Sequence, residues 1–278
     1  MRNSISKAAL IALTIFAVSA CTKDLNSKDP ATFYTNMVKN KLNLTPEEYL
    51  NYFSMQSLKD GNLTESAFIG NVKKTLDDLK FAGYKLEDVK INSVDKYDND
   101  TVIIRSSLKY KTSDKSEDQF TDDLVVLLLE NGTWKISLSN LIKHYHYTNS
   151  CGAAGSISLC IADSYIYPDK TMFSGKLNNA TNDKYTFGFA SPASILTVLA
   201  DNSKVYGDYP STHNGQTPIT IQPGENNMTF YFGTVLDPQL IKSPPVYFAI
   251  NQLKKVKWGG MPALGDKGQQ IDIDLHSK

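Results

Sequence analysis

Two histidines near the middle of the chain are the first residues whose spacing could support chemistry. His144 and His146 alternate with aromatic residues in Lys-His-Tyr-His-Tyr, residues 143–147. On a β-strand the two imidazoles would point the same way, about 7 Å apart, and neutral imidazole binds zinc and copper. The alternative is a strand end with inward tyrosines and solvated histidines. His144 and His146 are therefore weak metal candidates, and the sequence predicts no cofactor.

The N-terminal residues have the order of charge and apolarity that is typical of an export signal. Arg2 and Lys7 precede a short apolar run at residues 8–20. As a helix this run would rise about 20 Å, less than the roughly 30 Å hydrocarbon core of a membrane. Its end, Val-Ser-Ala-Cys at residues 18–21, resembles the lipobox of bacterial lipoproteins. The resemblance implies cleavage before Cys21 and lipid such as palmitate on its thiol; the alternative is an ordinary secretory signal.

The lipoprotein resemblance also implies a location. Two or more acyl chains hold a protein stably at a membrane. The chain is therefore expected at the cell membrane or the outer membrane, facing the periplasm or the exterior. Thr22, rather than aspartate, would be the second mature residue, which favours the outer membrane in a Gram-negative host. Residues 1–20 are then the signal peptide and residues 21–29 a tether.

The remaining cysteines form a pair once Cys21 is assigned to lipid. Only Cys151 and Cys160 are left among the three cysteines of the chain, and two thiols in an exported protein favour a disulfide. Small residues follow Cys151, so the short loop can close. A metal site that combines these cysteines with His144 and His146 is the alternative.

Composition limits the classes of partner. The chain has 29 basic and 29 acidic residues, and the loss of Arg2 and Lys7 with the signal leaves a small acidic excess. Such a surface has no basic excess to hold a polyanion, so nucleic acid is not an expected partner. Hydrophobic residues make up 41% of the chain, which is enough to fill the cores of folded domains.

Residues 30–147 predict three helices followed by four antiparallel strands. Asp29 and Pro30 give the start of a helix over 30–42, and Thr45 and Glu48 have capping-box spacing at the start of a second. A third helix is predicted from Thr64 to about residue 80. The strands are predicted over residues 86–97, 101–111, 120–129 and 133–138, with Asn-Gly at 131–132 as a hairpin turn.

This order of elements, ending in Glu-Asn-Gly-Thr-Trp-Lys-Ile at residues 130–136, resembles a cone-shaped nuclear transport factor 2-like (cystatin-like) domain. Some members of that family use Asp, His or Tyr inside the cone for acid–base chemistry, because an apolar pocket shifts carboxyl pKa values. The resemblance therefore implies an alternative in which Asp122 or Asp123 faces inwards beside Tyr34 and Tyr110. No family motif matches these residues one by one, so no catalytic residue is predicted.

Residues 157–278 contain short alternating apolar runs separated by turn residues, which is typical of a β-sandwich. Phe-Ser-Gly-Lys-Leu-Asn-Asn at 173–179 and Ile-Gln-Pro-Gly-Glu at 221–225 resemble segments of immunoglobulin-like envelope domains. A linker is expected at 148–156, where Gly, Ala, Ser and Asn cluster. The predicted class is α+β: a cone-like domain of three helices on a curved antiparallel sheet, followed by an all-β immunoglobulin-like sandwich.

Three aromatic residues of the second half are candidates for contact with a ligand or partner. Trp258 precedes two glycines, and Tyr206 and Tyr209 lie in a polar segment, so all three are predicted in loops. Exposed aromatic side chains on loops often take part in recognition. The alternative is that each ring folds back onto the sandwich.

The chain lacks the common short catalytic motifs. Gly-x-Ser-x-Gly, a phosphate-binding glycine loop, Cys-x-x-Cys and His-Glu-x-x-His are all absent from the sequence. The sequence therefore predicts a lipid-anchored, non-enzymatic envelope protein that binds a protein, a glycan or a small apolar ligand. An enzyme with an acid–base site within residues 30–147 is the first alternative, and a passive spacer is the second.

Overall fold

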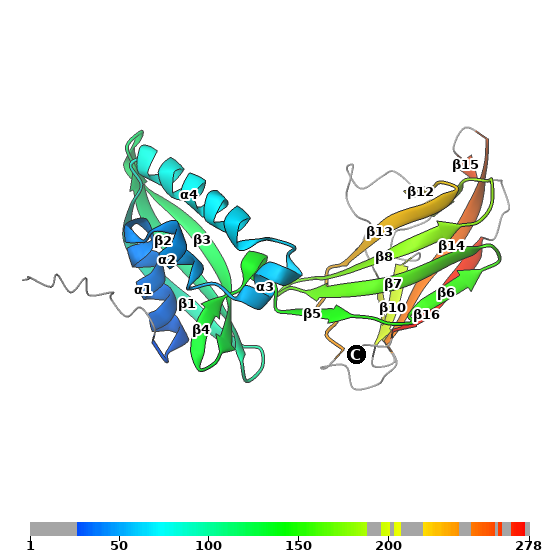
Figure 1. Cartoon of the computed structure of the whole chain (residues 1–278), viewed down its shortest axis with the longest axis horizontal. Helices are drawn as coiled ribbons and strands as arrows, with labels where there is room; N and C mark the ends of the chain where they lie inside the picture. The colour runs from blue at the N-terminus through cyan, green and yellow to red at the C-terminus, as the bar shows by residue number, and fades with distance from the viewer. Residues whose placement is uncertain are drawn as a thin grey trace, which may run out of the picture.

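The computed structural model describes residues 27–187, 196–200, 203–206, 219–238, 246–258, 261–262 and 268–275. These residues form an N-terminal unit of helices and one sheet and a C-terminal unit of strands, arranged along the long axis of the molecule (Figure 1). In this part of the chain, no helix is both long and apolar enough to cross a membrane.

Side-chain caps start each helix of the N-terminal unit. Asp29 accepts a hydrogen bond from the backbone of Thr32, Thr45 and Glu48 form a capping box, and Ser54 and Thr64 cap the next two helices. The helices are α1 (Pro30–Asn40), α2 (Pro46–Leu50), α3 (Met55–Asp60) and α4 (Glu65–Phe81), with 3₁₀ turns η1 (Lys41–Asn43) and η2 (Leu138–Asn140).

Four antiparallel strands form the sheet of the N-terminal unit, in the order β1-β2-β3-β4. They are β1 (Lys85–Lys96), β2 (Thr101–Thr112), β3 (Lys115–Glu130) and β4 (Thr133–Ile136). Asn131 and Gly132 both have positive φ, as a tight hairpin requires. Helix α1 buries Phe33 and Tyr34 against Ile104 of β2 and its neighbours, whereas α4 packs mainly with α2 and α3.

The predicted fold class is wrong. The described part of the chain is dominated by strands, and its N-terminal unit has four α-helices instead of the predicted three. The missed helix, α3, has six residues and buries only Leu58 among its apolar side chains, so it has no helical stripe to detect. Strands β1 and β2 lie within one residue of the predicted bounds, whereas β3 begins five residues earlier than predicted.

The C-terminal unit contains two antiparallel sheets. The first follows the order β13-β8-β7-β5, and β6 also pairs with β7; its strands are β5 (Lys143–His146), β6 (Cys151–Ala154), β7 (Ile157–Ile166), β8 (Thr171–Asn179) and β13 (Gly224–Phe232). The second follows β11-β10-β14-β9-β12, with β15 and β16 on β14; its strands are β9 (Tyr185–Phe187), β10 (Leu196–Ala200), β11 (Ser203–Tyr206), β12 (Ile219–Ile221), β14 (Val246–Trp258), β15 (Met261–Pro262) and β16 (Gln269–Leu275).

The chain passes between the units earlier than the expected linker. Residues 143–146 form β5, which pairs with β7, and residues 148–156 contain β6. The small residues that suggested a linker instead allow a close approach. A Cβ atom at Gly152 would lie 2.0 Å from the backbone oxygen of Asp272 in β16. Gly152 thus lets β6, a strand of the first sheet, contact the second sheet.

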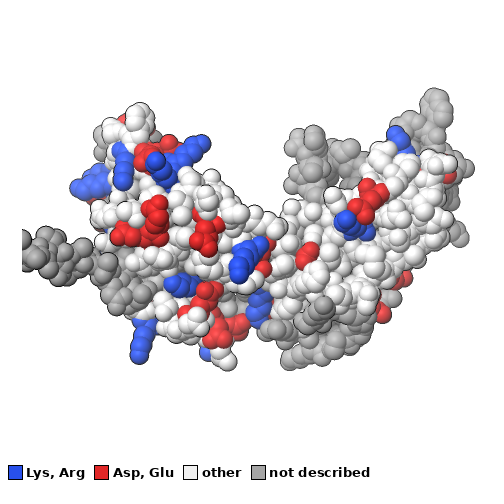
Figure 2. Space-filling model, in the orientation of Figure 1, with Lys and Arg blue, Asp and Glu red and all other residues white. Residues whose placement is uncertain are grey.

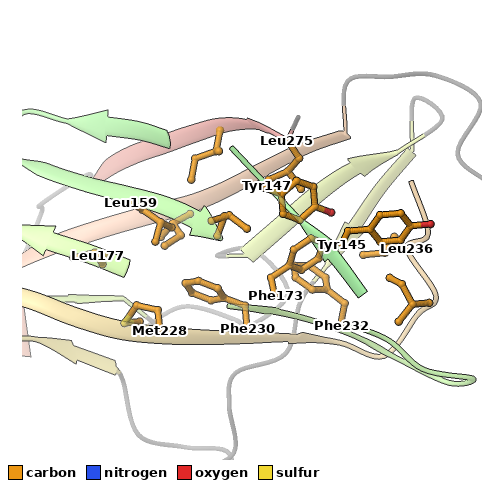
Figure 3. Packing of buried hydrophobic residues seen from close by; sticks show 14 of the residues in the cluster. Tyr145, Tyr147, Leu159, Phe173, Leu177, Met228, Phe230, Phe232, Leu236 and Leu275 are labelled. Carbon is orange, nitrogen blue, oxygen red and sulfur yellow. The ribbon is translucent and has the colours of Figure 1, made fainter. Parts of the chain in front are cut away.

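Among the described residues, a large apolar cluster of the C-terminal unit continues into the N-terminal unit. Its centre contains Phe173, Phe230 and Phe232, which are fully buried (Figure 3). Ile103 of β2 and Val126 of β3 belong to the same cluster. The two units therefore share apolar packing across their junction, which resists movement of one unit relative to the other.

Candidate functional site

Strand β5 begins at the junction of the units, close to α3 (Figure 1). It contains both predicted histidines, and His144 contacts Asp60 at the end of α3. His144 Nε2 lies 2.9 Å from Asp163 Oδ1, and His144 Nδ1 lies 3.0 Å from Asp60 Oδ1. His146 Nδ1 lies 3.1 Å from the same Asp163 oxygen. Asp60 ends α3, whereas Asp163 belongs to β7, so His144 connects the two units.

Burial and charge have opposite effects on the groups of this cluster. Burial lowers the pKa of His144, but Asp60 and Asp163 raise it, and the net result is a pKa above the usual value. Burial likewise raises the pKa of Asp163, but His146 and His144 bring it below its usual value. The ring of Tyr165 stacks on His144 with centroids 4.5 Å apart, which holds the imidazole in place.

We predict that His144 makes stability depend on pH. Because its pKa is raised by folding, its contribution is complete below the unfolded pKa of about 6.5 and is lost as the pH rises through the folded pKa. Urea unfolding between about pH 5.5 and about pH 8.5 should therefore show a larger loss of stability for the wild type than for His144→Gln. The more exposed His146, changed to Gln, is the control and should keep most of the dependence. Equal slopes for the wild type and His144→Gln would refute the prediction.

The geometry does not support a metal site at the two histidines. Both ring nitrogens of His144 already have carboxylate partners. Within the described ranges, no group of three or more His, Cys, Asp or Glu residues could hold a metal ion. The cluster is better explained as a network of hydrogen bonds and ion pairs.

Two hollows flank the contact between His144 and Asp60. One has a volume of about 380 Å³ and is lined by Gln56, Lys143 and both histidines, among others. The other, of about 370 Å³, has a floor of outward-facing side chains from β7 and β8 and a wall from the end of α3. Its polar and aromatic lining includes Asp60, Asn62, Tyr165, Tyr167 and Ser174. We call this second hollow the junction cleft.

A second polar cluster lies inside the N-terminal unit. The Tyr34 hydroxyl donates to Asp123 Oδ2 at 2.7 Å and lies 2.7 Å from Ser106 Oγ. Asp122 points to the other face of the sheet, where it accepts a hydrogen bond from Ser107. Of the two acidic candidates, Asp123 is therefore the inward one. Burial, with a smaller contribution from Asp123, raises the pKa of Tyr34.

An apolar pocket of about 260 Å³ opens beside this cluster, between η1, α2 and α4. Lys41 and Tyr49 are its only lining residues with a charged or phenolic group in the described chain. Burial raises the pKa of Tyr49 to about 12, with a further contribution from Asp123. Burial lowers the pKa of Lys41, and Asp123 partly offsets that effect.

Among the described residues, the other predicted site residues lie neither in the His144 cluster nor beside the Tyr34 cluster. Cys21 and Tyr209 lie outside the described residues. Tyr206 ends β11, where it pairs with Thr197, and Trp258 ends β14, where it pairs with Met261. The loop positions predicted for Tyr206 and Trp258 are thus strand ends.

The predicted pairing of Cys151 with Cys160 is confirmed. The disulfide joins β6 to β7 at directly opposite positions, with Cα atoms 4.0 Å apart. Because β6 also approaches β16, the bond holds a strand that contacts both sheets. It leaves neither thiol for a metal site with the histidines.

A scan against protein-family models finds no match for this chain, and a search of curated proteins finds no matching relative. The site must therefore be interpreted from its geometry. Sequence reasoning missed Asp60, Asp163 and Lys41, which are isolated charged residues without a motif. The polar position of Asp163 within the apolar strand β7 is the one signal that could have singled it out.

Proposed function

We propose that this chain is a lipid-anchored protein of the cell envelope that acts as a binding module, with its ligand site in the junction cleft. The lipobox-like sequence before Cys21 supports the anchor. The disulfide between Cys151 and Cys160 supports export, because structural disulfides are typical of oxidising compartments outside the cytoplasm. Ligand sites also occur preferentially at interfaces between structural units.

The lining of the junction cleft favours a glycan among the possible ligands. Tyr165 lies near the end of β7 and Tyr167 directly follows that strand; both line the cleft together with Asp60, which ends α3, and Asn62, two residues beyond it. Flat tyrosine rings can contact the apolar face of a sugar while carboxylate and amide groups bind its hydroxyls. This combination of two tyrosines with polar groups from the other unit is the observation that carries the proposal. Lys170 lies over the Tyr167 ring, and this exposed, flexible side chain can be displaced.

The charge distribution is consistent with a neutral ligand. On the face seen in Figure 2, most charged side chains belong to the N-terminal unit, and the described surface of the C-terminal unit is mostly uncharged. A polyanion would find little cationic surface there. A neutral oligosaccharide does not need a cationic surface to bind.

The proposal predicts a binding phenotype for the cleft. Oligosaccharides from bacterial envelopes, titrated by calorimetry, should bind the wild type and lose about tenfold or more in affinity, roughly 1.4 kcal/mol, with Tyr167→Ala or Asn62→Ala. Asp122→Ala, on the outer face of the other sheet, is the matched control and should bind as the wild type does. A glycan that binds both cleft variants at full affinity would place the site elsewhere and contradict the proposal.

The alternative, an acid–base enzyme, is favoured by one observation: Asp123 faces inwards and accepts a hydrogen bond from Tyr34. The raised pKa of Tyr34 keeps its hydroxyl protonated near neutral pH, so it can donate a hydrogen bond but is a poor base. A binding role requires no proton transfer, so it explains the cluster around His144 and the cluster around Tyr34 with fewer assumptions than an enzyme does.

A further inference from the structure

We propose that the apolar pocket of the N-terminal unit is a second binding site, separate from the junction cleft, for a small organic carboxylate with an apolar body. Its walls come mainly from three helical elements of the N-terminal unit. Lys41 begins η1, Tyr49 lies in α2, and α4 contributes Phe68, Val72 and Leu76. Its volume of about 260 Å³ is slightly below the range of about 300–1,000 Å³ for drug-sized ligand sites, which suits a smaller molecule.

The charged group and the phenolic group of the pocket lack partners, whereas the Thr75 hydroxyl in the lining donates a hydrogen bond to the backbone oxygen of Asn71. Among the described residues, the Lys41 ammonium makes no hydrogen bond or ion pair, and the Tyr49 hydroxyl makes no hydrogen bond. Asp123 lies close enough to influence the pKa values of both groups, but its carboxylate accepts a hydrogen bond from Tyr34. An ammonium that is partly removed from water and has no partner is costly. A carboxylate in the pocket would supply the missing acceptor for both donors.

The rest of the lining selects the body and the charge of the ligand. Phe53, Leu63 and Leu138 complete an apolar wall, which suits a hydrocarbon or aryl group. A single cation matches a single negative charge, whereas the nearby Asp123 would repel a dianion such as phosphate. The pocket therefore favours a monocarboxylate over a phosphate or a neutral lipid.

The test compares two probes that differ in charge. Octanoate and octanamide are titrated into the full chain and followed by calorimetry, with urea unfolding to show that each variant is folded. The wild type should bind octanoate at least about tenfold more tightly than octanamide. Lys41→Met should remove this preference and leave octanamide affinity unchanged, while Lys39→Met, an exposed change in the last turn of α1, should preserve it.

Two further outcomes separate this site from the junction cleft. Tyr167→Ala should not change octanoate affinity, so loss of glycan binding and loss of carboxylate binding are independent results. Val72→Trp should block both octanoate and octanamide by filling the pocket. Equal binding of the two probes to the wild type, retention of the preference in folded Lys41→Met, or no saturable binding of octanoate would overturn the proposal.

Discussion

Replacing Asp237 with alanine is expected to lower the free energy of unfolding by about 3 kcal/mol or more, because it leaves buried donors without their acceptor. Asp237 is 1% exposed. It accepts hydrogen bonds from the hydroxyls of Tyr97 and Tyr145, and its Oδ2 lies 3.4 Å from Lys143 Nζ. Tyr97 follows β1, whereas Tyr145 and Lys143 lie on β5. One carboxylate thus connects residues of the two units.

Urea unfolding of matched variants measures this effect. Tyr97→Phe removes one hydrogen bond and should cost about 1 kcal/mol. Asp122→Ala removes a carboxylate from an exposed position and should change stability by less than about 0.5 kcal/mol. Lys143 retains Asp98 as a second partner at 3.0 Å, so the predicted loss comes mainly from the two tyrosines. A cost for Asp237→Ala no larger than that for Tyr97→Phe would show that the carboxylate does not join the units.

The second large effect concerns the proposed lipid anchor. Cys21→Ser should abolish incorporation of labelled palmitate and move nearly all of the protein from the membrane fraction to the soluble fraction, because a serine hydroxyl cannot form the thioether that carries the lipid. Losing two or more acyl chains removes nearly all membrane affinity, since each buried methylene contributes about 0.8 kcal/mol.

The control for this experiment uses the other two cysteines. The double variant Cys151→Ser/Cys160→Ser removes the disulfide and should keep the palmitate label, although the chain will be less stable by about 2–3 kcal/mol. If Cys21→Ser remained labelled and membrane-bound, the lipobox interpretation would be wrong. The signal would then be an ordinary secretory one or the attachment would lie elsewhere.

The helix caps and the hairpin turn could be predicted from the sequence alone. The caps at Asp29, Thr45 and Thr64 start helices where predicted, and Asn131-Gly132 forms the hairpin turn. These features depend on side chains within a few residues of each other, so spacing is sufficient to predict them. Helix α3 was missed because six residues with one buried apolar side chain show no periodicity.

The disulfide and the lipid anchor were both inferred from the sequence, but only the disulfide is confirmed by the structure. Cys151 and Cys160 are nine positions apart, and their strands place them opposite each other. Cys21 lies outside the described residues, so its lipid remains a prediction that rests on the order of residues 2–21.

The tertiary structure alone decided where the candidate sites lie. His144 meets Asp60 across 84 positions, and Tyr97 meets Asp237 across 140. Such contacts depend on the register of β5 against β7 and on how the two units pack, and neither is encoded in the spacing of nearby residues. The sequence therefore determined the local caps and turns, the cysteine pair and the expected cellular location of this protein. Long-range packing decided that its histidines bridge two units and that Lys41 faces an apolar pocket without a partner.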